Sequence, residues 1–287
     1  NKGTILLRNI KTTSELFPKA FFIREGLFRF QNEKMFFEKF RADYGKSDFA
    51  LNGHLLNTIN YFIESNGTLS GNFNLHSKLI NVDEFMALKE GENKDRKPQV
   101  EYAKEDHPKM SGVVVLPTDL NVALNIDANK VEYNGLILNA LAGKVGLNAG
   151  QFTLEKVGFD IIGCRVGIDA RYKAESPLTA NFDARLQAKD FDVQRAYKEV
   201  PMFREMVSAA EKAKGIISLD YAIKGDLDGN MAPIYESLAG GGTINLRDVQ
   251  VTGLKLFSTV SEKTGQSGID NPRMEGINVK TSIDNNV

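Results

Sequence analysis

The sequence predicts a mainly β protein with a few short helices, built on one long, curved antiparallel sheet. Apolar and polar residues alternate from Leu120 to Ala128, which is typical of a strand with one dry and one wet face. Glycine and asparagine recur between such runs, where hairpins turn. The apolar positions change from even numbers at Ala128 to odd numbers at Val131. A β-bulge near each such change predicts a bent strand and therefore a curved sheet.

The first third of the chain is expected to hold short strands and one helix. Strands are predicted at 4–10, 21–24 and 27–31, with turns at Pro18 and Gly26. Two longer strands within 35–56 are separated by a turn at Gly45. A short helix is predicted within 55–63, and alternation returns from 67 to 80.

A strongly charged segment divides the chain. Residues 89–109 carry 12 charged residues out of 21 and have no apolar period, so they cannot offset their ordering entropy by burial. The sequence therefore predicts an N-terminal β lobe at 1–88, a charged loop or linker at 89–110, and a β meander with short helices at 111–287.

The second lobe contains the longest alternating runs. Because each run ends in a turn signal, successive strands are expected to pair as antiparallel neighbours. A helical turn is predicted at 193–197, an amphipathic helix opened by Pro201 at 201–212, and further helices at 232–238 and 254–263. The strands are predicted at 119–133, 135–147, 150–162, 164–173, 177–189, 215–224, 242–251 and 276–283.

Residues with catalytic or metal-binding chemistry are sparse. The three histidines, His54, His76 and His107, have no second His or Cys at ligand spacing, so no metal site is predicted. The single cysteine, Cys164, excludes an intramolecular disulfide and is expected to be a small buried apolar residue. No nucleophile motif is present, and the glycines of AGGGT at 239–243 are interpreted as a flexible helix exit. The DLDG stretch at 226–229 is interpreted as a plain turn.

These observations predict no catalytic residue, no metal and no cofactor, and a protein that is not an enzyme. The net charge of −1, and the lack of basic residues clustered with aromatic ones, argue against nucleic-acid binding. Unrecognised paired carboxylates remain the basis of an enzyme alternative.

The dry face is the remaining feature. A strand of about 14 residues extends about 45 Å, and the few short helices expected cannot cover a sheet of such strands. Either a second sheet packs on it as a β-sandwich, or the sheet curls as a groove or half-barrel around an apolar guest. The residues expected to face inward are Leu120, Val122, Leu124, Ile126, Val166, Ile168 and Phe182.

Three segments resemble the periplasmic region of AsmA-like proteins, a family that includes TamB-type members. They are residues 47–88, with the core LSGNFNL, residues 117–171, which begin PTDLNVALNIDANKVEYNG, and residues 240–265, which begin GGGTINL. The resemblance implies a curved sheet with an apolar groove, a periplasmic location with tethering to the inner membrane by a segment absent from this chain, and no catalytic residues.

The resemblance also implies a role in outer-membrane integrity and phospholipid movement. The working hypothesis is a non-enzymatic cell-envelope protein that contacts lipid or envelope membrane proteins through the groove. The alternative is a structural or protein-interaction β domain with a closed core and no lipid ligand. The chain begins without Met and ends inside an expected strand, so it is expected to be the soluble portion of a longer protein.

Overall fold

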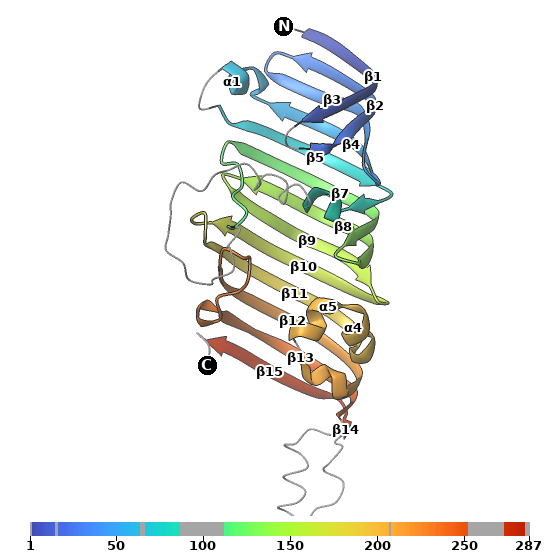
Figure 1. Cartoon of the computed structure of the whole chain (residues 1–287), viewed down its shortest axis with the longest axis vertical. Coiled ribbons are helices and arrows are strands. Elements are labelled where there is room, and N and C mark those ends of the chain that lie inside the picture. Colours follow the sequence, from blue (N-terminus) through green and yellow to red (C-terminus); the bar gives the residue numbers. More distant parts are fainter. Residues whose placement is uncertain are drawn as a thin grey trace, which may run out of the picture.

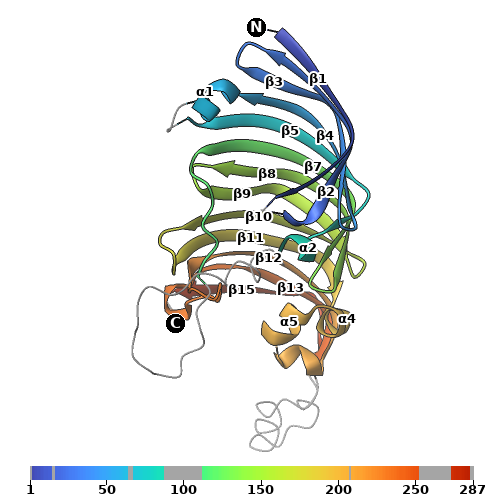
Figure 2. The ribbon, with the colours of Figure 1, turned by 45° about the horizontal axis from the view of Figure 1, so that its top comes forward.

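The alternating segments form one continuous sheet of fifteen strands in the computed structural model. The structure describes residues 2–14, 17–63, 67–86, 112–206, 208–251 and 273–284. The sheet is long and open, and it curls about an axis that runs across its strands (Figures 1 and 2). The prediction of a mainly β fold with a long, curved sheet is confirmed.

Most strands follow one another in space as they do in sequence, in the order β1-β2-β3-β4-β5-β7-β8-β9-β10-β11-β12-β13-β14, with β15 also on β13 and β6 on β7. Their bounds are β1 (Lys2–Ser14), β2 (Phe17–Gln31), β3 (Lys34–Tyr44), β4 (Ser47–Leu56), β5 (Leu69–Ser77), β6 (Ile80–Asn81), β7 (Leu120–Tyr133), β8 (Leu136–Asn148), β9 (Gln151–Ile161), β10 (Cys164–Ala174), β11 (Ala180–Asp192), β12 (Ala213–Leu227), β13 (Ala239–Val251), β14 (Arg273–Met274) and β15 (Ile277–Asp284).

The long hairpins of the second lobe close through two-residue turns. Asn134 and Gly135 join β7 to β8 with φ values of 49° and 75°, and Ile162 and Gly163 join β9 to β10 with 48° and 79°. Two successive positive φ values match the twist of the flanking strands, and glycine adopts such values without strain. The predicted hairpin at Asn134 and Gly135 is therefore confirmed.

Parallel pairing joins the two parts of the sheet. β5 pairs with β7 in parallel, from Leu69 opposite Leu120 to Ser77 opposite Ala128, and the short β6 also pairs with β7 in parallel. The expected lobes at 1–88 and 111–287 consequently share one sheet, while the meander predicted over 119–189 is antiparallel from β7 to β11. A parallel neighbour needs a crossover connection, which residues 78–119 supply. The charged segment expected as a loop at 89–110 lies outside the described residues.

The strands continue through Gly26 and through the AGGGT glycines, where interruptions were predicted. These glycines leave room for a neighbouring side chain or for the backbone of the next strand. β2 is continuous through Gly26, where a Cβ would come within 2.7 Å of the Phe28 ring, so the turns predicted at Pro18 and Gly26 are wrong. The AGGGT glycines lie within β13 rather than at a helix exit. At Gly242 a Cβ would come within 2.2 Å of the Asp220 carbonyl oxygen.

The helices are α1 (Thr58–Ile63), α2 (Asp83–Met86), α4 (Val193–Glu199), α5 (Pro201–Met206) and two 3₁₀ turns, η1 (Ser208–Lys212) and η2 (Tyr235–Ser237). α4 is longer than the turn predicted at 193–197, and α2 was not predicted. The single helix predicted at 201–212 is therefore two elements, and the one at 232–238 is a single 3₁₀ turn. The helix predicted at 254–263 lies outside the described residues.

β-bulges bend several long strands, although β7 keeps its register with β8 from Ala128 to Val131, where a bulge was predicted. Non-glycine residues with left-handed φ lie inside five strands: Asn9 (54°), Ala140 (48°), Lys156 (50°), Asp190 (55°) and Asp248 (54°). Register shifts accompany the last four, for example between Ala188 and Phe191. A bulged amide leaves the ladder and needs another acceptor. The Lys156 N–H donates to the Asp169 carboxylate at 2.8 Å, and the Asp190 N–H donates to the Ser218 hydroxyl at 2.9 Å.

α2, α4 and α5 lie on the concave side of the sheet at one end of the strands, whereas α1 lies at the other end (Figures 1 and 2). The Asp192 carboxylate caps α4 by accepting the Arg195 N–H at 2.8 Å. Val193 and Ala196 of α4 pack on Phe159, Cys164, Val166 and Phe191 of the sheet. Near α2, the Phe85 ring stacks on Tyr44, with ring centroids 4.8 Å apart. Cys164 is 3% exposed, which confirms its prediction as a buried apolar residue.

Candidate functional site

An uninterrupted row of uncharged residues crosses the concave face of the sheet. Residues directly opposite each other on paired strands point to the same face. Following the register from strand to strand therefore traces a row with one position in each of thirteen strands. The row is Ile5, Phe28, Phe37, Gly53, Phe73, Leu124, Val145, Leu154, Ala170, Ala184, Ile223, Gly240 and Ile283.

Adjacent rows have the same character. One runs through Gly71, Val122, Leu147, Phe152, Tyr172, Phe182 and Gly225, from β5 to β12. Another runs through Val157, Ile168, Leu186, Tyr221, Gly242 and Thr281, from β9 to β15. None of these described positions carries a charge. At about 4.8 Å per strand, the full row is about 58 Å long. We call this surface the inner face.

The structure places all seven residues predicted to face inward on the inner face. Leu120, Val122, Leu124 and Ile126 come from β7, Val166 and Ile168 from β10, and Phe182 from β11. Val166 is buried against the α4 end of the sheet, and the other six are partly exposed. The set therefore spans two environments, one covered by helices and one partly open.

Among the described residues, cover on the inner face lies at the two ends of the strands. At one end lie α2, α4, α5 and η1. At the other end the extended segment 112–117 crosses the strand ends, where the Val113 N–H donates to the Pro177 oxygen at 2.9 Å and the Gly150 N–H to the Pro117 oxygen at 3.1 Å. The Tyr172 hydroxyl also donates to the Val114 oxygen at 2.9 Å.

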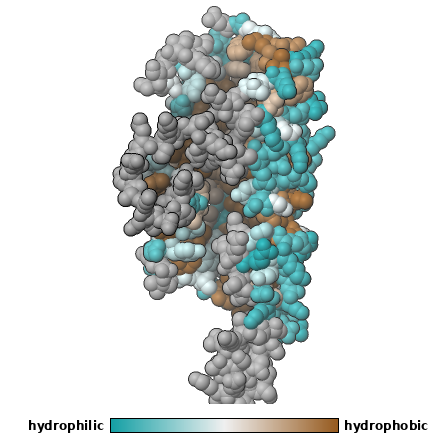
Figure 3. Space-filling model, in the orientation of Figure 1, coloured by the Kyte–Doolittle hydropathy of each residue, from teal (hydrophilic) through white to brown (hydrophobic). Residues whose placement is uncertain are grey.

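Between these covers the side chains keep partial exposure. Leu186, in the middle of the face, is 38% exposed. In Figure 3 hydrophilic residues dominate the right side of the molecule, and the clearest hydrophobic patch lies at the top. The described residues form one open sheet, so the alternative of a two-sheet β-sandwich is wrong.

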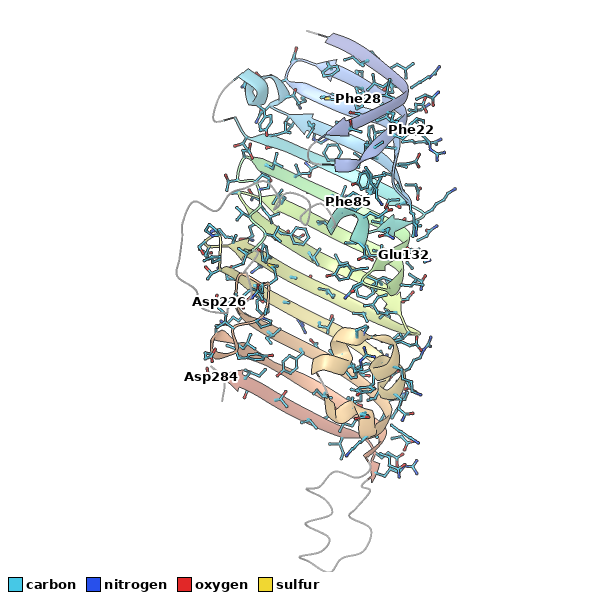
Figure 4. The ribbon with its side chains drawn as sticks, in the orientation of Figure 1. Phe22, Phe28, Phe85, Glu132, Asp226 and Asp284 are labelled. Carbon is cyan, nitrogen blue, oxygen red and sulfur yellow. The ribbon has the colours of Figure 1, made fainter. Side chains whose placement is uncertain are left out.

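The N-terminal strands add an aromatic section to the inner face that sequence reasoning missed. The Phe28 ring meets Phe37 edge to face with centroids 5.0 Å apart, and Phe37 meets Phe73 in the same way at 5.1 Å. Figure 4 shows Phe28 and Phe85 over the sheet, whereas Phe22 lies at the outer wall. The missed signal is MFFEKF at 35–40, where a bulge between Phe37 and Phe40 changes the parity and hides the alternation.

The opposite face is polar and held by hydrogen bonds between side chains. The Asn125 amide donates to Asn74 at 2.9 Å, and Asn74 donates to Asn52 at 3.0 Å, which forms a ladder across β7, β5 and β4. The Arg185 guanidinium binds the Asp220 carboxylate through two hydrogen bonds of 2.7 Å. These bonds from Arg185, with one from Gln187, lower the pKa of Asp220 from 3.8 to about 2.

This outer face also contains a hollow of about 950 Å³ over β9 to β13. Its floor includes Gly158 and Gly167, which lie opposite each other. Ion pairs at its walls join Arg185 to Asp220 and Arg247 to Asp190, the second at 3.5 Å. The hollow is therefore lined by cations and anions that largely neutralise each other.

Charged groups flank the inner face at the strand ends. Figure 4 places Glu132 at one end and Asp226 and Asp284 at the other. Glu132 accepts a hydrogen bond of 2.7 Å from Lys130, which lowers the pKa of its carboxyl. The inner face is thus an apolar strip between charged rims, a surface suited to the apolar part of an amphipathic molecule.

The residues considered for chemistry lie apart from the inner face or are buried. His76 Nδ1 is 3.4 Å from the Asp127 carboxylate on the outer face, and His107 lies outside the described residues. The Cys164 thiol donates to the Lys189 oxygen at 3.2 Å, and burial raises its pKa. In the DLDG stretch, Asp228 accepts the N–H groups of Asn230 and Ala232, as in the plain turn predicted.

Within the described part of the chain, no group of three or more His, Cys, Asp or Glu side chains is arranged to hold a metal ion. No helix among the described residues has the length and hydrophobicity to cross a membrane. Comparisons with protein-family models, curated protein sequences and solved structures identify no match for this chain. The resemblance to AsmA-like proteins therefore rests on the sequence segments alone.

Proposed function

We propose that the inner face is a groove for lipid acyl chains, in a non-enzymatic protein of the bacterial cell envelope that contributes to outer-membrane assembly or integrity. The single observation that carries the proposal is the uncharged row across thirteen strands, in which only Phe28 and Phe73 are buried and the other eleven positions are at least partly exposed. Exposed apolar areas larger than a few hundred Å² are uncommon on soluble proteins and mark binding surfaces.

The chemistry of the groove favours a flexible hydrocarbon over a polar ligand. Burial of an acyl chain in the groove is favourable by about 0.8 kcal/mol of transfer free energy for each methylene, and an acyl chain needs no hydrogen bond from the groove. The side chains of Leu124, Ala184 and Ile223 supply such contacts without a charged group. A phospholipid whose chains lie on the strip leaves its polar head at a charged rim.

The envelope location rests on the resemblance to AsmA-like proteins. In that setting the protein is periplasmic, tethered to the inner membrane by a segment outside this chain, and works with envelope membrane proteins. A groove open along its length suits phospholipid that moves between membranes, because each step exchanges one apolar contact for another of similar free energy.

Lipid capture by the purified chain tests the proposal. The protein is expressed in a bacterial host, purified without detergent, and analysed by native mass spectrometry and by lipid extraction. We expect phospholipid to co-purify, and we expect Leu186→Asp and Ile126→Asp to lose most of it, because each places a carboxylate on the strip. Ala222→Asp, on the outer face of β12, is the matched control and retains the lipid.

Circular dichroism establishes that each variant is folded. A folded wild-type chain that carries no lipid, and that takes up no fluorescent phospholipid from vesicles, would refute the proposal. Equal lipid content in Leu186→Asp and Ala222→Asp would refute the assignment of the site to the inner face.

A further inference from the structure

The N-terminal end of the sheet has the properties of a strand-docking edge. β1 is the first strand in the order and, among the described residues, pairs only with β2. Its register with β2 extends from Lys2 to Ser14, so a similar length of backbone faces away from the sheet (Figure 1). An edge strand of this length offers unpaired N–H and C=O groups to another chain.

The inner face reaches this edge without a change of character. Ile5 lies opposite Phe28 and Ile10 lies opposite Ile23, so both continue the apolar surface. Ile5 is 47% exposed and Ile10 is 40% exposed. A further strand with apolar residues at the facing positions would cover both side chains and lengthen the groove wall.

The other face of β1 is basic. Lys2, Arg8 and Lys11 all point to the outer side by their register, and the strand contains no acidic residue. Opposite charges on directly paired residues stabilise strand pairs, and like charges destabilise them. The edge therefore selects a strand with acidic residues on its outer side.

A second copy of the chain fits this edge poorly. β15, at the other end of the sheet, presents Asn278, Lys280, Ser282 and Asp284 on its outer side, a set with no net charge. It would bring one anion, Asp284, and one further cation, Lys280, to the three cations of β1, of which Arg8 already lies opposite Glu25 of β2.

We propose that β1 binds an extended segment of another protein, in which apolar residues alternate with acidic ones, and that this segment adds a strand to the sheet. Main-chain hydrogen bonds supply affinity in this mode of recognition, and alternate side chains supply specificity. The proposal concerns the edge and does not depend on lipid in the groove.

Peptide binding tests the edge. A fluorescent peptide of about ten residues, alternating valine with glutamate, spans most of β1. A second peptide carries lysine in place of glutamate. By fluorescence anisotropy we expect the acidic peptide to bind at least about tenfold more tightly than the basic one. The double variant Arg8→Glu, Lys11→Glu should lower affinity for the acidic peptide at least about tenfold and raise affinity for the basic one. Lys144→Glu with Lys224→Glu, on outer-face positions far from β1, should leave both affinities unchanged.

Hydrogen exchange locates the bound peptide. Increased protection in β1 supports docking at the edge, and unchanged β1 protection with protection elsewhere overturns it. Equal affinity for the two peptides also overturns the proposal. Concentration-dependent self-association, with cross-links between β1 and β15, would mean that a second copy of the chain occupies the edge. That result would contradict the proposal of a foreign strand. Leu186→Asp should bind the acidic peptide as the wild type does, which separates this test from the lipid test.

Discussion

Truncation of one phenylalanine at the α4 end of β11 and one near the other end of that strand should have unequal costs. Phe191 is 7% exposed, packs with α4, and meets Phe203 edge to face at 5.8 Å. Phe182 lies on the same side of the same strand and is only partly buried. Phe191→Ala removes a buried ring and leaves a cavity, which costs about 3–4 kcal/mol. Phe182→Ala removes a side chain that is only partly buried, so it loses about half the free energy of transferring a phenylalanine side chain out of water. It leaves no closed cavity, and the cost is about 1 kcal/mol.

These costs translate into melting temperatures that are easy to separate. With an unfolding entropy of about 2.1 cal/mol/K per residue, a chain of this length loses about 1.7 °C for each kcal/mol. Phe191→Ala should melt about 5–7 °C below the wild type, and Phe182→Ala about 2 °C below it. Because the chain has no tryptophan, the transition is followed by far-ultraviolet circular dichroism. Similar losses at both positions would mean that the inner face near the start of β11 is as well covered as the α4 end, which would refute an open groove there.

Three further predictions concern individual residues. The Asp220 pKa of about 2 lies below its ordinary value of 3.8, so the stability this carboxylate contributes is present above about pH 4 and is lost as the pH falls toward 2. Its side chain is 42% exposed, so solvent screening limits the contribution to about 1 kcal/mol, and Asp220→Asn should flatten the melting temperature between pH 4 and pH 2. Cys164 should react with a disulfide reagent at least about a hundredfold more slowly in the folded protein than in urea, because its thiol is buried and its pKa is raised. A fast reaction in the folded protein would contradict the packing of Cys164 under α4. Lys156→Gly should raise the melting temperature by about 1 °C, because glycine adopts the bulge φ of 50° without strain, whereas Lys224→Gly should lower it; a loss at both would argue against the bulge.

Much of the strand pattern could be predicted because alternation is a local property. The strands predicted at 119–133 and 164–173 correspond to β7 and β10 within one residue at each end. All seven inward-facing residues fall on one face because a period of two fixes the side of each residue along a strand. The failures at Gly26 and at the AGGGT glycines share one cause. A glycine opposite an aromatic ring or a close backbone resembles a turn signal in sequence, and only the neighbouring strand distinguishes the two.

The sequence alone determined that long strands would have one apolar and one polar face, and that bulges would bend them. It left open what covers the apolar face, because a sandwich core and a groove wall require the same alternation. For the described residues the tertiary structure decided this: it pairs the fifteen strands into one open sheet, with α2, α4, α5 and η1 at one end of the strands and the segment 112–117 at the other. The physical reason is that alternation fixes the direction of a side chain relative to its own backbone, whereas cover depends on contacts between segments far apart in the chain.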